Sequence, residues 1–92
     1  MIKNFKHKGL KRFFENNDLS GIQARHADKL NDILDLLDAA ECAADMNVPG
    51  YMLHLLEPKR NMIYSVRVSG NWRVTFRMNG RDAEIVDYLD YH

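Results

Sequence analysis

The chain has 92 residues, of which 46% are hydrophobic and 28% are charged. This length accommodates one domain with one hydrophobic core, and the composition is that of a globular protein. Cys42 is the only cysteine, which excludes an intramolecular disulfide and a cysteine-based zinc site. No apolar run approaches the ~18 residues that a membrane span needs, and the first residues lack the pattern of a signal peptide. We therefore expect a single soluble, cytoplasmic domain over residues 1–92, with no membrane partner.

Charge is unevenly distributed along a chain whose formal net charge is zero. Residues 1–23 are mainly basic, residues 24–50 are mainly acidic, and basic residues return in the C-terminal part. The C-terminal group includes Lys59, Arg60, Arg67, Arg73 and Arg77. A chain divided in this way can present one basic and one acidic face, which is compatible with binding RNA on one side.

The N-terminal part predicts a short strand and then a helix. Apolar residues suggest a strand from Ile2 to Phe5. Leu10, Phe13 and Phe14 follow at helical spacing, which predicts a helix over Lys8 to Asn16. The polar run after Asn16 ends it.

A second helix is predicted by the periodicity of the next segment. Ser20 with Gln23 three residues later fits a capping box at its start. The apolar stripe consists of Leu30, Ile33, Leu34 and Leu37, and the acidic residues Asp28, Asp32 and Asp35 face the other way. We interpret this as a helix that packs on the core and exposes an acidic face to solvent. Pro49 and Gly50 mark the turn that follows.

From Met52 onward the pattern alternates between apolar and polar residues, as in strands. Asn79-Gly80 is a strong hairpin signal, because a type I′ turn needs positive φ at both central positions. Two helices followed by hairpin-linked strands predict an α+β fold.

The predicted turn at Asn79-Gly80 fixes the register of the last hairpin. It pairs Met78 with Arg81, Phe76 with Ala83, Val74 with Ile85 and Trp72 with Asp87. The apolar members of these pairs predict the core face, on which Asp87 is an unexplained polar residue. The other face receives Arg73, Thr75, Arg77, Glu84, Val86 and Tyr88, and Asp90 and His92 as well if the strand continues.

The preceding turn is predicted by parity to have three residues, Ser69 to Asn71, with a positive-φ residue and a bulge. This loop pairs Val68 with Trp72 and Arg67 with Arg73. Two adjacent arginines repel each other unless an anion lies between them, so this pair is either a phosphate site or a plain solvated face.

His54 lies inside the apolar run Met52 to Leu56, which also predicts a strand. A histidine in such a run is more often structural than catalytic. If Leu53 and Leu55 face the core, however, His54 points to the polar face that carries Arg67 and Arg73.

Four segments together resemble the HigB toxins of the RelE-like superfamily of type II toxin–antitoxin systems. They are residues 2–11, Leu53-His54, residues 71–76 (Asn-Trp-Arg-Val-Thr-Phe) and the closing Asp90-Tyr91-His92. The resemblance covers nearly the whole chain. It implies a small mixed, mainly antiparallel β-sheet packed against two N-terminal helices. It also implies a ribosome-dependent mRNA endoribonuclease that acts in the ribosomal A site.

The resemblance further implies the site and the partners. Carried over by motif position, the catalytic residues are His54, Arg73, Asp90, Tyr91 and His92. We expect RNA and ribosome contacts from the basic residues Lys6, Lys8, Lys59, Arg60, Arg67 and Arg77. Some relatives have a lysine shortly after the histidine where this chain has Glu57, so Lys59 or Arg60 would have to replace it. The implied partners are the 70S ribosome with its mRNA and a HigA-like antitoxin with a helix-turn-helix, which alone contacts operator DNA.

The implied reaction needs no metal and no cofactor, because the 2′-hydroxyl of RNA can attack the adjacent phosphate. Imidazole suits the two proton transfers because its pKa of about 6.5 lies near working pH. We assign these transfers to His54 and His92, and the stabilisation of the phosphate charge to Arg73. Asp90 could orient an imidazole or act as a general base. Tyr91 could stack on a nucleobase or bond a phosphate oxygen.

Two other function classes compete with this one. A non-catalytic module could block translation by binding RNA or the ribosome through the basic face. A DNA-binding regulator acting alone is disfavoured, because the exposed faces of the predicted helices are acidic rather than basic.

Overall fold

The computed structural model describes residues 1–57 and 61–91. The helical elements in chain order are α1 (Lys8–Asn16), the 3-10 turn η1 (Ala24–His26), α2 (Ala27–Ala39) and the 3-10 turn η2 (Ala43–Met46). The strands are β1 (His54–Glu57), β2 (Ile63–Ser69), β3 (Trp72–Asn79) and β4 (Asp82–Asp90). In these residues no helix is long and apolar enough to cross a membrane.

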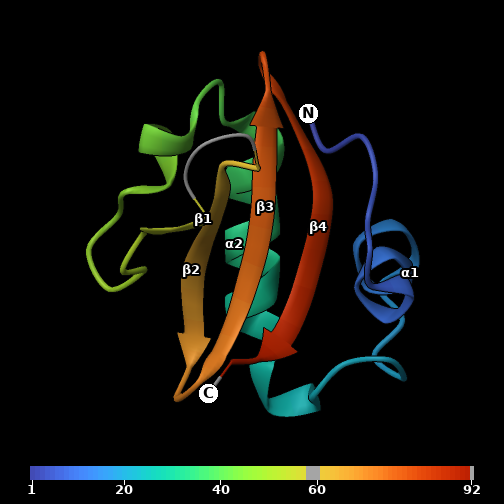
Figure 1. The fold of residues 1–92 in the computed structure, drawn as a ribbon. Coiled ribbons are helices and arrows are strands. Elements are labelled where there is room, and N and C mark those ends of the chain that lie inside the picture. The colour runs from blue at the N-terminus through green and yellow to red at the C-terminus, as the bar shows by residue number, and fades with distance from the viewer. Residues whose placement is uncertain (58–60, 92) are drawn as a thin grey trace.

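The four strands form one antiparallel sheet in the order β1-β2-β3-β4, and α2 lies across one face of it (Figure 1). The N-terminal segment runs beside β4 and forms isolated parallel bridges, Ile2 with Ala83 and Phe5 with Val86. The predicted strand from Ile2 to Phe5 is thus reduced to two bridges. The predicted α+β fold, a mainly antiparallel sheet with two helices, is confirmed.

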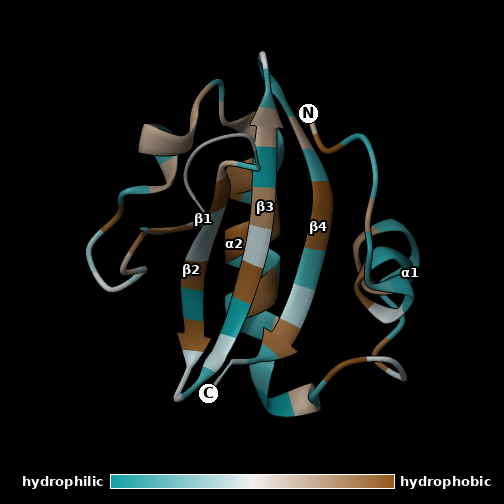
Figure 2. Cartoon of the chain, viewed as in Figure 1, coloured by the Kyte–Doolittle hydropathy of each residue, from teal (hydrophilic) through white to brown (hydrophobic). Residues whose placement is uncertain are grey.

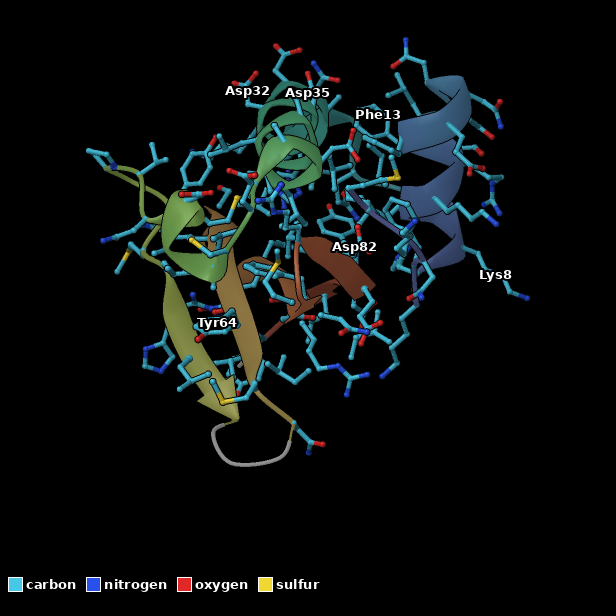
Figure 3. All side chains as sticks on the ribbon, turned by 90° about the horizontal axis from the view of Figure 1, so that it is seen from above. Lys8, Phe13, Asp32, Asp35, Tyr64 and Asp82 are labelled. Atoms are coloured by element: carbon cyan, nitrogen blue, oxygen red, sulfur yellow. The ribbon has the colours of Figure 1, made fainter. Side chains whose placement is uncertain are left out.

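Helix α1 has the predicted bounds. His7 begins it, because its Nδ1 accepts a hydrogen bond from the Leu10 N–H at 3.0 Å. Asn17 ends it in the left-handed region with φ 57°, where asparagine is tolerated better than most residues. Leu10 and Phe13 are buried in the core, and Figure 3 shows Phe13 directed from α1 toward α2.

Helix α2 supplies the predicted apolar stripe, and all four of its side chains are buried: Leu30, Ile33, Leu34 and Leu37. Burial of each such side chain contributes about 1.5–3 kcal/mol relative to exposure. Asp32 and Asp35 point away from the sheet in Figure 3, as the acidic face of the sequence predicted.

The predicted capping box at Ser20 is wrong. α2 begins at Ala27 after the turn η1, and neither η1 nor α2 has a side-chain cap at its start. The backbone N–H of Ser20 instead donates to Asp18 Oδ1 at 2.9 Å. Aspartate forms such local bonds with the backbone two residues on, which favours a turn over a helix start.

Alternation of hydropathy along β2, β3 and β4 is visible in Figure 2. In the first hairpin, Arg67 pairs with Arg73 as predicted, whereas Val68 does not pair with Trp72. Trp72 pairs with Ser69, and the register shifts between Arg67 and Ser69. The predicted positive-φ residue is Gly70, at 57°. The bulge absorbs the extra residue, so the turn closes without moving Arg67 off the face of Arg73.

The predicted register of the last hairpin is wrong at its turn. Asn79 pairs with Asp82, so the loop consists of Gly80 and Arg81. Only Gly80 has positive φ there (62°), which matches a type II′ loop with glycine at its first central position rather than the predicted type I′ loop.

A β-bulge changes the register of β4 a second time. Arg77 pairs with Glu84, but Thr75 pairs with Asp87, and Ile85 within this shift has φ 48°. Beyond the bulge every residue of β4 therefore lies on the face opposite to the predicted one. Val86 and Tyr88 are buried in the core, whereas Asp87 leaves it.

Candidate active site

The face of the sheet opposite α2, called the open face below, carries one polar row across all four strands. The register aligns His54 of β1, Ser65 of β2, Thr75 of β3 and Asp87 of β4. Cross-strand partners have their Cβ atoms about 4.5–5.5 Å apart, so neighbours in this row are within reach of one another. The row places the predicted histidine among three polar residues from the other strands.

Arg73 and His54 come together on this face. They line a hollow of about 350 Å³ with Met52 and Leu53. His54 is exposed and Arg73 is half-buried, with its Nη1 donating to the Ser65 hydroxyl at 3.4 Å. The predicted position of His54 on the face of Arg73 is therefore confirmed. Strand β1 starts at His54 rather than at the predicted Met52, whose φ is 52°.

Arg67 is the neighbour of Arg73 in the register, and its side chain is exposed. Its Nε donates to the Gly70 carbonyl at 3.3 Å. The ion pairs among the described residues leave both guanidiniums without an acidic partner there. Their charge is thus available to an anion, and the phosphate site remains a prediction.

A backbone hydrogen bond links the end of the described chain to the turn between β2 and β3. The Tyr91 N–H donates to the Asn71 carbonyl at 2.8 Å, and the Tyr91 side chain is 46% exposed. Asp90 pairs with Trp72 on β3, so strand alternation turns it to the α2 side and not to the predicted face of Arg73. The cause is the bulge at Ile85. His92 lies outside the described residues.

The predicted RNA-binding cations are distributed over several surfaces. Lys6 borders the open face, and Lys8 points outward from the start of α1 in Figure 3. Arg77 is held by Glu84, whose Oε1 lies 2.7 Å from Nη2 and 2.8 Å from Nε. Lys59 and Arg60 fall outside the described residues.

A second hollow of about 210 Å³ lies on the open face beside the Arg73 hollow. Its lining residues include Lys6, Thr75, Ile85, Asp87, Leu89 and Tyr91. Sequence reasoning assigned no role to Ser65, Thr75 or Asp87. The anomaly of a carboxylate on a predicted core face was the signal that the register at Asp87 was wrong.

A buried histidine lies beneath the end of the sheet, on the α2 side. His26 is 3% exposed, its Nδ1 lies 2.6 Å from the Tyr88 hydroxyl, and its ring meets Trp72 edge to face. Its Nε2 is buried without a hydrogen-bond partner among the described residues. Burial, with a smaller effect of the nearby Arg25 charge, holds the pKa of His26 below its usual value. Burial likewise raises the pKa of Tyr88.

Comparison with known families supports the resemblance to HigB toxins that the sequence motifs indicated. Residues 3–92 match the family described as RelE-like toxin of type II toxin–antitoxin system HigB. The chain belongs to this family. It is 45% identical to "Endoribonuclease HigB" of Proteus vulgaris, over all of both chains. It is also 34% identical to an uncharacterized protein of Haemophilus influenzae, over 98% of this chain and 90% of the other. Membership of a type II toxin–antitoxin family implies an antitoxin partner.

Proposed function

We propose that this chain is the endoribonuclease toxin of its toxin–antitoxin pair and that it cuts translated mRNA on the ribosome. The observation that carries the proposal is the hollow shared by His54 and Arg73. A titratable group and a fixed cation that border one accessible hollow are the minimum for phosphodiester cleavage. The name of the Proteus relative supports the class of reaction.

In the proposed reaction the ribose 2′-hydroxyl attacks the adjacent phosphorus and the 5′-oxygen departs. His54 and His92 carry the two proton transfers, one as base and the other as acid. Arg73 borders the same hollow as His54, and we assign its guanidinium to the phosphate oxygens, whose charge grows during the reaction. Its bond to the Ser65 hydroxyl holds it half-buried, which reduces the reorganisation needed when the phosphate arrives.

Tyr91 and Asp90 have separate places in the proposal. The exposed ring of Tyr91 can stack on a base of the message. Asp90 follows the α2 side of β4, so we assign it an indirect role, as a residue that orients the chain end that carries His92. Arg67, Lys6 and Lys8 supply positive charge for the RNA and the ribosome.

The proposed setting follows from this substrate. A toxin that cuts translated messages works in the cytoplasm on the 70S ribosome. The HigA-like antitoxin neutralises it and contacts operator DNA through a helix-turn-helix. Because the nucleophile is the 2′-hydroxyl, cleavage is expected to persist when chelator removes free metal, provided that the magnesium of the ribosome is preserved.

The test uses the chain end. The wild type, expressed under tight control without its genomic neighbour, is expected to arrest growth and to give new 5′ ends within codons by primer extension. A variant lacking Tyr91 and His92 is expected to do neither, while its circular-dichroism melt stays nearly unchanged. Growth arrest with intact messages would instead favour a non-catalytic inhibitor of translation, and arrest by the truncated variant would remove His92 from the mechanism.

A further inference from the structure

The second hollow on the open face has the make-up of a site for a flat, partly polar group. Its walls include the apolar side chains of Ile85 and Leu89, and Tyr91, a residue that is 46% exposed, borders it. Thr75 and Asp87, which face each other in the register, supply a hydroxyl and a carboxylate. Small-ligand sites combine mostly apolar walls with a few convergent polar groups in this way.

The bulge in β4 is the reason that this hollow exists. Without it, the strand would turn Val86 and Tyr88 to the open face and would bury Asp87. The bulge requires φ 48° at Ile85, a β-branched residue that rarely adopts this conformation. The N-terminal segment holds it there, because Asn4 Oδ1 accepts from the Ile85 N–H at 2.6 Å and Lys6 N donates to the Val86 carbonyl at 2.8 Å. Strain maintained by surrounding contacts is concentrated at functional sites.

One oxygen of the Asp87 carboxylate already accepts a hydrogen bond within the protein. Its Oδ1 accepts from the Tyr88 N–H at 2.9 Å, which fixes the orientation of the side chain. An ionised carboxylate only accepts hydrogen bonds, so the remaining oxygen of Asp87 can bond a donor group that enters the hollow. Exocyclic amino groups of cytosine, adenine and guanine are such donors. Uracil presents carbonyl oxygens at the corresponding positions, which a carboxylate repels.

We propose that this hollow is the base-specificity pocket of the toxin, in which one nucleobase of the message stacks on Tyr91 and donates its exocyclic amino group to Asp87. The proposal rests on the proposed function and names its substrate preference: a base with an amino group, and not uracil, at one position next to the cut. Lys6, at the edge of the hollow, is placed to neutralise a phosphate of the same nucleotide.

The position of the hollow relative to Arg73 supports this assignment. Leu89, in the wall, is the register partner of Arg73, and Thr75 follows Arg73 by two residues on the same face. A base in the hollow therefore lies one row of the sheet from the guanidinium that is proposed to hold the phosphate. That spacing is within the reach of one nucleotide.

The experiment compares cytosine with uracil, because the two are of similar size and differ at the amino group. Ribosomes with an empty A site carry messages that have either base at each codon position, and cleavage rates are measured for the wild type and Asp87→Asn. At one position the wild type is expected to favour cytosine by about tenfold, the value of one good hydrogen bond. Asp87→Asn, which can also donate, is expected to bring that ratio close to one and to leave the other positions unchanged.

Asp82→Asn is the matched control, because it makes the same carboxylate-to-amide change at the other end of β4. It is expected to keep the wild-type ratios. The pocket is overturned if the wild type discriminates at no position, or if Asp87→Asn keeps its discrimination. It is also overturned if Asp87→Asn weakens only the complex with the antitoxin. If the wild type cuts no message, the proposed function itself fails and the pocket with it.

A second measurement needs no variant. Cytidine and uridine monophosphates are titrated into the wild-type toxin, and the amide resonances of Thr75, Asp87 and Leu89 are followed by NMR. Cytidine monophosphate is expected to shift them at about tenfold lower concentration than uridine monophosphate. Equal concentrations, or shifts elsewhere only, would contradict the pocket even if Asp87→Asn did not fold.

Discussion

On the side of the sheet that packs against α2, apolar side chains such as Leu34 and Val74 are fully buried, and the buried histidine His26 bonds Tyr88. On the open side, polar side chains from all four strands stand in one row, and those of β1, β3 and β4 border two hollows. The same four strands thus separate two tasks. One face holds the fold together, and the other carries the charged and hydrogen-bonding groups that the proposed function assigns to RNA. Substitutions on the α2 side should therefore lower stability, whereas substitutions on the open side should lower the rate of cleavage.

The largest expected loss of stability comes from the α2 side. Leu34→Ala removes a side chain that is 1% exposed and leaves a cavity between α2 and the sheet. We expect the free energy of unfolding to fall by about 2–5 kcal/mol. Urea denaturation measures this change, and the cleavage rate per folded molecule is expected to stay at the wild-type value. A large loss of rate in the folded fraction would show that the two faces are coupled.

Arg73→Ala tests the open face, and its effect is expected in the rate of cleavage and not in stability. We expect it to cost about 3 kcal/mol of transition-state stabilisation, which lowers the cleavage rate on ribosomes by roughly a hundredfold or more. Its side chain is half-buried and, among the described residues, forms one hydrogen bond of 3.4 Å, so the urea midpoint should move little. Arg81→Ala is the control, because this exposed arginine pairs with Glu41 away from both hollows. Equal rates for the two variants would remove Arg73 from the site.

Gly9→Ala tests a contact that belongs to neither face. A Cβ at Gly9 would lie 2.5 Å from the Gly21 carbonyl oxygen, so the backbone of α1 or of the following loop has to move. We expect destabilisation of about 1–3 kcal/mol without loss of cleavage by the folded fraction. Lys11→Ala, at an exposed position of the same helix, should change stability by less than about 0.5 kcal/mol. A Gly9→Ala variant as stable as the wild type would contradict the close approach.

The comparison of the two faces also explains how far the sequence could predict the structure. Local patterns predicted the bounds of α1, the apolar stripe of α2 and the pairing of Arg67 with Arg73, because each depends on residues close together in the chain. The alternation of β1 and β3 was sufficient to predict that His54 and Arg73 share one face, and both line one hollow.

The bulge in β4 could not be predicted in the same way. It requires positive φ at Ile85, against the preference of a β-branched residue, and it is held by Asn4, 81 residues away in the chain. The consequence was an inverted assignment for every later residue of β4, including Asp87 and Asp90. Adjacent apolar residues at Ile85 and Val86, followed by a carboxylate on a predicted core face, were the local sign of it.

The smallest expected effect concerns the buried histidine of the α2 side. Because the pKa of His26 is lowered in the folded state, the unfolded chain binds the proton more tightly. Stability is therefore complete above the usual pKa of about 6.5, and it falls as the pH decreases from there to the folded pKa. Asp18 and Asp45, whose pKa values are also lowered, lose their contributions to stability only below pH of about 3.8 and do not affect this pH range.

We expect melts at pH 7.5 and pH 5.5 to differ for the wild type, and His26→Gln to remove part of that difference. An identical difference in the variant would assign the pH dependence to groups outside the contact of His26 with Tyr88 and Trp72.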